Sequence, residues 1–427
     1  MAETAGNGGV QHRRVVLTGM GVVTPVGNDR DTFWQNVKAG TSGVGPITRF
    51  DASALDTRFA AEVKDFDAEL YMDRKDARRA DRFVRFAAGA TAQALSQAGI
   101  SADTMDPERL GVIIGSGIGG IETWEGQFLT LQEKGPSRVS PFFIPMMISD
   151  MASGQISMMF GAKGPNYCTV SACSSGAHAI GESFYTIQRG DADAIITGGT
   201  EASITTLSVA GFCAMRALST RNDDPAHACR PFDGTRDGFV MGEGAGVVIL
   251  EALEHAQARG AAILAEVIGY GATADAHHMT APAPGGEGAA RAMKRCLVVA
   301  GLEPSQVDYI NAHGTSTPMN DKYETMAMHS TFGDAIRGIP VSSTKSMMGH
   351  LLGASGGVEL IVCVMAMEHG FLPPTINYST PDPDCDLDYV PNVGRSASLN
   401  VAMSNSFGFG GHNVSLAVRR WIGGGDG

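Results

Sequence analysis

The sequence predicts an α/β protein whose sheet is built from parallel strands. Apolar, β-branched runs that end in glycine alternate along the chain with helical patterns, which is typical of this class. A chain of 427 residues is long enough for two domains or for one large buried core. The clearest strand-like runs cover residues 13–21, 110–117, 193–201 and 265–271.

The first and last of these runs share a plan, in which a β-branched stretch leads into Gly-x-Gly. Gly19 and Gly21 close the first run, and Gly269 and Gly271 close the last. This similarity indicates two related halves that meet near residue 262. We therefore expect a flexible tail over residues 1–12, an N-terminal half over residues 13–262 and a C-terminal half over residues 263–427.

Composition and charge exclude several classes of function. The net charge of −13 argues against nucleic acid as the main partner, because phosphate contacts need clustered Lys and Arg. We find no apolar run of the roughly 18 residues that a membrane span needs and no secretory signal, so we expect a cytoplasmic protein. The seven cysteines include no CxxC pair and no zinc-ligand spacing, so we expect reduced thiols and no structural metal.

The segment GSGIGG at 115–120 invites comparison with a dinucleotide-binding loop. It lacks the GxGxxG spacing, and no acidic residue ends a clear following strand. We therefore expect no nucleotide site there.

One cysteine lies where a reactive thiol would be useful. Cys173 stands in TVSACSSGAHAIGESF, between an alternating pattern that runs to Ala172 and a helical pattern that follows. A helix N-terminus favours the thiolate, so we expect a lowered pKa for this thiol. A cysteine is more often a small buried apolar residue, but the small, polar surroundings SACSSG favour a nucleophile.

Two histidines lie at comparable turns. His313 follows a strand-like run at 307–310 and precedes a helix start at Thr317, while Lys345 and His350 follow another strand and precede a long apolar helix. Each histidine alone would more often be structural. Open α/β sheets place their sites at strand ends, so together they are candidates for the partners of a nucleophile.

The helix after His350 carries an isolated carboxylate, Glu359, between apolar neighbours. Burying it requires a cation or hydrogen-bond donors, and Lys345 or a nearby backbone N–H is a candidate. A surface-facing position on an amphipathic helix fits the sequence equally well.

Four motifs carry a resemblance to a known family. They are SACSSG around Cys173, NAHGTSTP around His313, STKSMMGHLLGASG around Lys345 and His350, and SNSFGFGGHN near the end. In this order they resemble the elongating, type II branch of the β-ketoacyl-acyl carrier protein synthases, from about residue 13 to residue 420. One Cys with two His separates the chain from the type III branch and from thiolases. The departures from the family pattern are Ser174, Met348 and His412.

The resemblance implies a thiolase-like fold, in which two related βαβ-rich halves pack into five αβαβα layers, usually as a homodimer. It also implies that fatty acids are elongated by two carbons from malonyl and acyl thioesters, which are held on the phosphopantetheine of acyl carrier protein. Neither a metal nor a redox cofactor is expected, because the loss of CO2 generates the carbanion.

Residue roles follow from the same resemblance. Cys173 holds the acyl group, and the backbone N–H groups of Cys173 and Phe409 bind the oxyanion. His313 and His350 stabilise the enolate. The other implied roles are orientation by Lys345 with support from Glu359, pantetheine binding by Thr315 and Thr317, an acyl tunnel lined by Ile118 and Phe212, and a gate at Phe409.

A basic run, DRKDARRADRFVR at 73–85, is the candidate docking surface for the carrier protein. Helical spacing would place Lys75, Arg78, Arg79 and Arg82 on one face. The ordinary alternative is a solvated helix whose cations pair with the neighbouring aspartates. The resemblance matches carrier-docking positions at Lys75 and Arg78 and so favours docking.

Three alternatives remain. A polyketide ketosynthase uses the same chemistry, and a Cys-His thioester hydrolase would use water as the acceptor. A non-catalytic partner of the same fold is disfavoured, because such partners lack the nucleophile that Cys173 provides.

Overall fold

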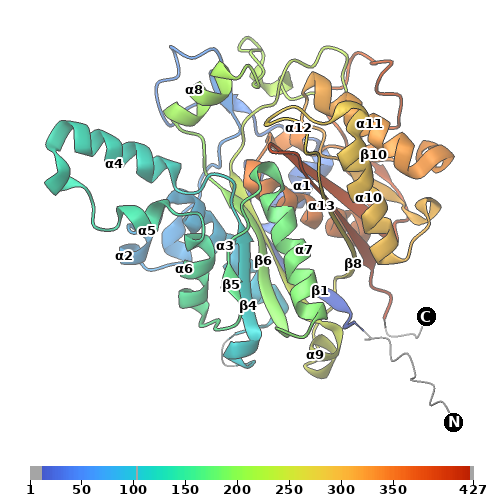
Figure 1. Ribbon diagram of the computed structural model, residues 1–427, viewed down its shortest axis with the longest axis horizontal. Helices are drawn as coiled ribbons and strands as arrows, with labels where there is room; N and C mark the ends of the chain where they lie inside the picture. Colours follow the sequence, from blue (N-terminus) through green and yellow to red (C-terminus); the bar gives the residue numbers. More distant parts are fainter. Residues whose placement is uncertain (1–11, 102–103, 424–427) are drawn as a thin grey trace.

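The computed structural model describes residues 12–101 and 104–423, which form a mixed α/β architecture (Figure 1). The expected tail over residues 1–12 lies almost wholly outside the described residues. Ten strands form one sheet in the order β10-β9-β13-β14-β8-β1-β7-β6-β4-β5. They are β1 Val15–Val23, β4 Leu110–Gly115, β5 Asn166–Tyr167, β6 Ala194–Glu201, β7 Gly244–Ala252, β8 Ala265–Ala274, β9 Tyr309–Asn311, β10 Val341–Ser342, β13 Val401–Gly408 and β14 His412–Arg420.

Two further pairs of short strands lie outside this sheet, β2 Gly45–Pro46 with β3 Phe59–Ala60 and β11 Phe371–Leu372 with β12 Arg395–Ser396. The helices are α1 Arg30–Ala39, α2 Arg74–Ala77, α3 Arg82–Ala98, α4 Ile121–Lys134, α5 Phe143–Met147, α6 Met151–Phe160, α7 Ser175–Gln188, α8 Thr206–Ala214, α9 Leu253–Ala258, α10 Glu287–Ala300, α11 Pro318–Phe332, α12 Lys345–Met348 and α13 Ser355–His369.

The strand order repeats between the two halves of the chain. The first half reads β1-β7-β6-β4-β5, and the second reads β8-β14-β13-β9-β10 in the same sense. The halves join where β1 pairs with β8, with Val15 opposite Val267 and Leu17 opposite Ala265. This repeat confirms the two related halves, while the boundary at residue 262 stays a prediction.

Helices cover the sheet in layers (Figure 1). α3 packs on β1 and β7 of the first half, and α10 packs on β8 and β14 of the second. α7 and α13 contact strands of both halves, so they form a central layer between them. The expected five-layer αβαβα arrangement is therefore confirmed.

The expectation of a parallel sheet is only half right. β4 pairs in parallel with β5 and β6, and β9 with β10 and β13. The central strands β1, β7, β8 and β14 pair antiparallel with their neighbours. The short turn between β13 and β14 forces that pair to be antiparallel, since a parallel connection needs a crossover.

The repeated Gly-x-Gly plan has one physical cause in both halves. A Cβ on Gly21 would lie 2.1 Å from the carbonyl oxygen of Ala90 in α3, and a Cβ on Gly271 would lie 2.1 Å from that of Ala292 in α10. These distances are too short for a side chain, so glycine lets each outer helix rest on the strand backbone.

The segment Leu352–His369, which contains α13, has the length and composition of a membrane span, contrary to our expectation from the sequence. It is 89% buried inside the protein. A helix that is apolar all round is also what a central layer between two sheets requires.

We predict that Gly271→Ala destabilises the protein by about 1–3 kcal/mol or more, because its methyl group forces α10 away from β8. Gly338→Ala is the control, since nothing lies within 4 Å of its Cβ position, and it should change stability by less than about 0.5 kcal/mol. Urea unfolding monitored by circular dichroism measures both. Equal midpoints for the two variants would contradict this account of the glycine plan.

Candidate active site

Cys173 lies in a 3₁₀ turn, Ala172–Ser174, directly before α7. The strand expected to run to Ala172 ends at Tyr167. Ala172 has a φ of 51°, a left-handed conformation that turns the chain sharply into the helix. The hydroxyl of Ser175 closes this turn by donating to the Ala172 carbonyl at 2.7 Å and accepting from the Ser171 N–H at 3.0 Å.

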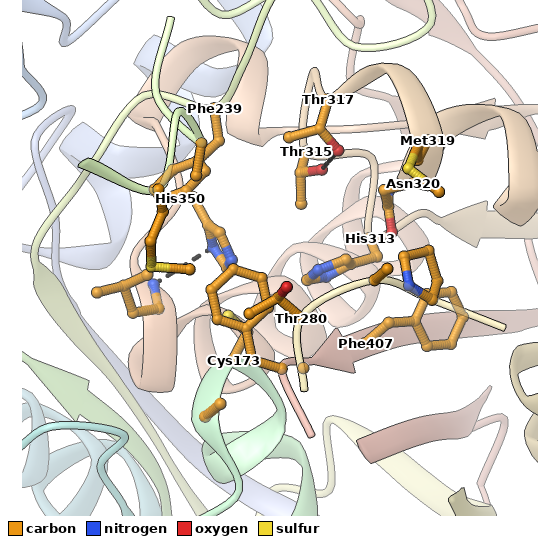
Figure 2. Close-up of a pocket in the computed structure, with 18 of the residues that line it drawn as sticks. Cys173, Phe239, Thr280, His313, Thr315, Thr317, Met319, Asn320, His350 and Phe407 are labelled. Atoms are coloured by element: carbon orange, nitrogen blue, oxygen red, sulfur yellow. Dashed lines mark hydrogen bonds between the residues drawn. The ribbon is translucent and has the colours of Figure 1, made fainter. Parts of the chain in front are cut away.

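The two histidines come from the second half of the chain and lie close together. His313 follows β9, and His350 lies between α12 and α13. Their ring centroids are 5.2 Å apart with an interplanar angle of 85°. Figure 2 shows both imidazoles on the side of the pocket that faces Cys173.

The pKa directions and the contacts at Nδ1 indicate that both imidazoles are neutral with the proton on Nε2. Burial and the charge of Lys345 hold the pKa of His313 and of His350 well below the usual value. Nδ1 of His350 accepts from the N–H of Leu352 at 3.3 Å, and Nδ1 of His313 lies 3.4 Å from the Lys345 ammonium, which can only donate. Each histidine therefore keeps an Nε2–H donor for a ligand.

Lys345 and Glu359 form a buried ion pair behind the histidines. Lys345 is 1% exposed, and its ammonium also donates to the carbonyl oxygen of His313 at 2.7 Å. Burial raises the pKa of Glu359 to about 7, against the opposing charge of Lys345. Of the two positions left open by the sequence, the buried one is correct.

The predicted residues meet in one cavity of about 540 Å³. The side chains of Thr315 and Thr317 lie on its wall, with their hydroxyl oxygens 2.9 Å apart (Figure 2). The residues expected from the sequence that bound it are Cys173, His313, His350, Thr315, Thr317, Ile118, Phe212 and Phe409. The mixture of an apolar wall with a few convergent polar groups is typical of a small-molecule site.

Comparison with known proteins identifies the family. The model of the beta-ketoacyl synthase N-terminal domain matches residues 12–256, and that of the C-terminal domain matches residues 264–379. The chain belongs to the beta-ketoacyl synthase family. The 3-oxoacyl-[acyl-carrier-protein] synthase 2 of Synechocystis sp. is 56% identical over 96% of this chain and 99% of its own length.

Solved structures agree with the family assignment. A beta-ketoacyl synthase from Burkholderia phymatum has a TM-score of 0.90 at 38% identity, covering 96% of this chain and all of its own. A type II polyketide ketosynthase, solved in complex with its acyl-carrier protein, has a TM-score of 0.90 at 34% identity over the same shares. The thiolase-like fold expected of a beta-ketoacyl synthase is thus confirmed.

The expected pKa of the nucleophile is wrong in direction. Burial raises the pKa of Cys173 to about 12, and the charge of Glu201 adds to this rise. Lys345 and the backbone N–H groups of Phe409 and Cys173 act in the expected direction but are outweighed. The local helix N-terminus therefore does not lower the pKa of this thiol, because burial outweighs it.

The basic run at 73–85 is not one helix. α2 ends at Ala77, and Asp81 caps the separate helix α3. Arg82 turns inward and pairs with Glu243, so it does not share a face with the other cations. Lys75, Arg78 and Arg79 are exposed.

Some buried residues of the synthase site escaped the sequence analysis. Glu324 accepts the backbone N–H groups of His313 and Gly314, each at 2.8 Å, and so fixes the turn that carries the histidine. Ser355 lies 3.0 Å from Nδ1 of His350. In the sequence Glu324 stands out only as a residue near a helix start. Its contact with His313 depends on how α11 folds back against the turn, which the sequence does not show.

Proposed function

We propose that this chain is a 3-oxoacyl-[acyl-carrier-protein] synthase that elongates fatty acids by decarboxylative condensation. The observation that carries this proposal is the meeting of Cys173 with two neutral imidazoles, each presenting Nε2–H to one cavity. The names and identities of the relatives support the same reaction. The substrates are carried on phosphopantetheine, and we propose no further cofactor.

The first half-reaction moves the acyl group to the enzyme. The sulfur of Cys173 attacks the thioester carbonyl, and the N–H groups of Cys173 and Phe409 hold the oxyanion that forms. When this intermediate collapses, the bond from the carbonyl carbon to the pantetheine sulfur breaks. The proton of the Cys173 thiol ends on the departing pantetheine thiol, so charge is conserved.

The second half-reaction forms the new carbon–carbon bond. The malonyl carboxylate leaves as CO2, and its bonding electron pair becomes an enolate whose oxygen accepts from Nε2–H of His313 and His350. The enolate carbon attacks the acyl-enzyme carbonyl, the bond from that carbon to the Cys173 sulfur breaks, and the thiolate takes up one proton from solvent. Neutral imidazoles suit this step because they donate without first needing protonation.

The alternatives are less well supported. A type II polyketide ketosynthase shares the fold at 34% identity, whereas relatives named 3-oxoacyl-[acyl-carrier-protein] synthase 2 reach 54–56%. A hydrolase needs a water held as the acceptor, and the apolar wall near Ile118 and Phe212 favours exclusion of water. The gate at Phe409 and the cytoplasmic location stay predictions; stopped-flow acylation of Phe409→Ala and cell fractionation would test them.

We predict that Cys173→Ala abolishes condensation and forms no acyl adduct in intact-protein mass spectrometry. Cys173→Gln should lose elongation yet keep or raise malonyl decarboxylation, because its amide imitates the acyl-enzyme carbonyl. An adduct retained at full stoichiometry in Cys173→Ala would contradict the assignment. His313→Ala is the complementary variant, in which CO2 release should be lost.

We propose that the exposed cations Lys75, Arg78 and Arg79 dock the carrier protein. In this run, Arg74 forms an ion pair with Glu69 and Arg82 with Glu243. Within the described residues, the three proposed docking cations form none. The guanidinium of Arg79 lies over the ring of Phe142, 4.3 Å from its centroid. A local basic patch can steer an acidic partner even when the net charge of the enzyme is negative.

We predict that reversing Lys75 and Arg78 to Glu weakens turnover with carrier-bound donors, chiefly at low salt, through slower association. Acylation by a small pantetheine thioester should stay nearly intact. Reversal of Lys294 and Arg295 on α10 is the matched control, since it changes the net charge equally on the opposite side of the molecule (Figure 1). Equal losses with both donors, or in both variants, would contradict docking at α2.

We also propose that the synthase is a homodimer. α4 and α5 project from the body as an arm (Figure 1), and this arm exposes large apolar side chains such as Leu129 at 57% and Ile144 at 56%. Val170, 61% exposed, lines a surface hollow with Trp124 of α4 and Met147 of α5, and β5 is an edge strand of the sheet. Contiguous apolar surface beside a free strand edge is typical of an interface with another chain.

We predict twice the monomer mass in light scattering, and a shift to the monomer for the double variant Leu129→Glu with Ile144→Glu. Val298→Glu is the control, because Val298 is 68% exposed on α10 at the other side of the molecule. A monomeric parent protein, or a dimer unaffected by the double variant, would contradict this interface.

A further inference from the structure

The glycine-rich turn at 115–120 surrounds the carboxyl group of a side chain from another strand, Glu201. The carboxylate of Glu201, at the end of β6, is 0% exposed and bounds the cavity. It accepts the backbone N–H groups of Gly117 at 2.8 Å and of Ile118 at 3.2 Å. Its further donors are the N–H of Gly119 and the hydroxyls of Ser116 and Ser203.

The same carboxylate reaches the other half of the chain. It accepts the N–H of Gly353 at 3.1 Å, in the 3₁₀ turn between His350 and α13. A Cβ on Gly353 would lie 2.7 Å from Oε2 of Glu201, and one on Gly117 would lie 2.9 Å from it. Glycine at both positions lets the two turns close around the carboxylate.

The turn Leu352–Ala354, which donates to Glu201, has the same form as the turn Ala172–Ser174, which carries Cys173. Ala172 before α7 has a φ of 51°, and Leu352 before α13 has a φ of 49°, and each opens a 3₁₀ turn at the N-terminus of a central helix. Cys173 and Gly353 therefore hold equivalent places in the two halves. At the second place the N–H of Gly353 donates to Glu201, whereas at the first place Cys173 bounds the cavity.

We propose that Glu201 is a positioning residue of the synthase: it fastens the turn that carries Ile118 to the turn that follows His350, and so sets the wall of the acyl cavity. This inference rests on the proposed function, because it assigns Ile118 to the acyl chain. Every partner of the carboxylate is a donor, so replacement by an amide places an NH2 group against N–H or O–H donors and opens the clamp.

Glu201 also acts on the thiol of Cys173, so the pKa of that thiol gives a second measurement of its role. Lys345 from the second half and Glu201 from the first act on the thiol, and the neutral rings of His313 and His350 bound the same cavity. Burial, followed in part by Glu201, raises the pKa of Cys173, while Lys345 lowers it. Removing the carboxylate charge should therefore lower the pKa of this thiol. A pKa lower by one gives about tenfold more thiolate at a pH below the pKa.

The test compares Glu201→Gln with Glu251→Gln in the full-length protein. Glu251 is equally buried in β7 but pairs with Arg259 away from the cavity, so it controls for the loss of a buried carboxylate. Alkylation of Cys173 by iodoacetamide is followed against pH by mass spectrometry. Elongation of a short and a long acyl donor gives the ratio of their kcat/KM values.

We expect Glu201→Gln to shift the alkylation profile to lower pH and to change the donor ratio, with elongation slowed by roughly tenfold, within the about 10²-fold that a 1 Å misplacement can cost. Glu251→Gln should change neither readout. Ser116→Ala keeps the charge but loosens the turn, so it should change the donor ratio and leave the alkylation profile in place.

Several outcomes would overturn the proposal: unchanged readouts in Glu201→Gln, equal changes in Glu251→Gln, or an alkylation shift with an unchanged donor ratio. If Glu201→Gln does not fold, Ser116→Ala decides, and an unchanged donor ratio overturns the positioning role. Alkylation does not depend on condensation, so a protein that passes this readout but never elongates would disprove the proposed function and leave the electrostatic coupling in place.

Discussion

The close packing of the two central helices at their N-termini is the constraint on which the site depends. A Cβ on Gly176 in α7 would lie 2.8 Å from the carbonyl oxygen of Gly353, and one on Gly357 in α13 would lie 2.3 Å from that of Gly246 in β7. Larger side chains would push the halves apart. Because these glycines permit contact, Cys173 from one half and His350 from the other bound the same cavity.

Burial at this contact also determines the state of the ionisable groups. It raises the pKa of Cys173 to about 12 and of Glu324 to about 7, and it lowers the pKa of His313 well below its usual value. Lys345 pairs with Glu359 and bears on both the thiol and the imidazoles. In such surroundings fixed N–H donors act strongly on a developing negative charge, because little water screens them.

The sequence was most informative where a local pattern and a motif agree. Strand ends in both halves predicted the meeting of Cys173, His313 and His350, and the repeated Gly-x-Gly plan predicted the paired architecture. It failed where the decisive contact is distant. Arg82 pairs with Glu243, 161 residues away, and so leaves the face expected for the cations of residues 73–85. The lowered thiol pKa failed for the same reason, since burial by the whole fold outweighs the local helix N-terminus.

The two halves share a framework but use it differently. Each central helix begins after a left-handed residue, Ala172 or Leu352, and each presents N–H groups at its start. A buried N–H group without an acceptor is costly, so each of these turns needs an acceptor at its start. In the second half Glu201 accepts the N–H of Gly353, which ties the two turns together. In the first half Cys173 bounds the cavity, and in the proposed reaction its N–H binds the oxyanion of the thioester. The two turns thus differ in one respect: a side chain of the protein, Glu201, accepts the N–H of Gly353, whereas Cys173 faces the cavity that takes the substrate in the proposed reaction.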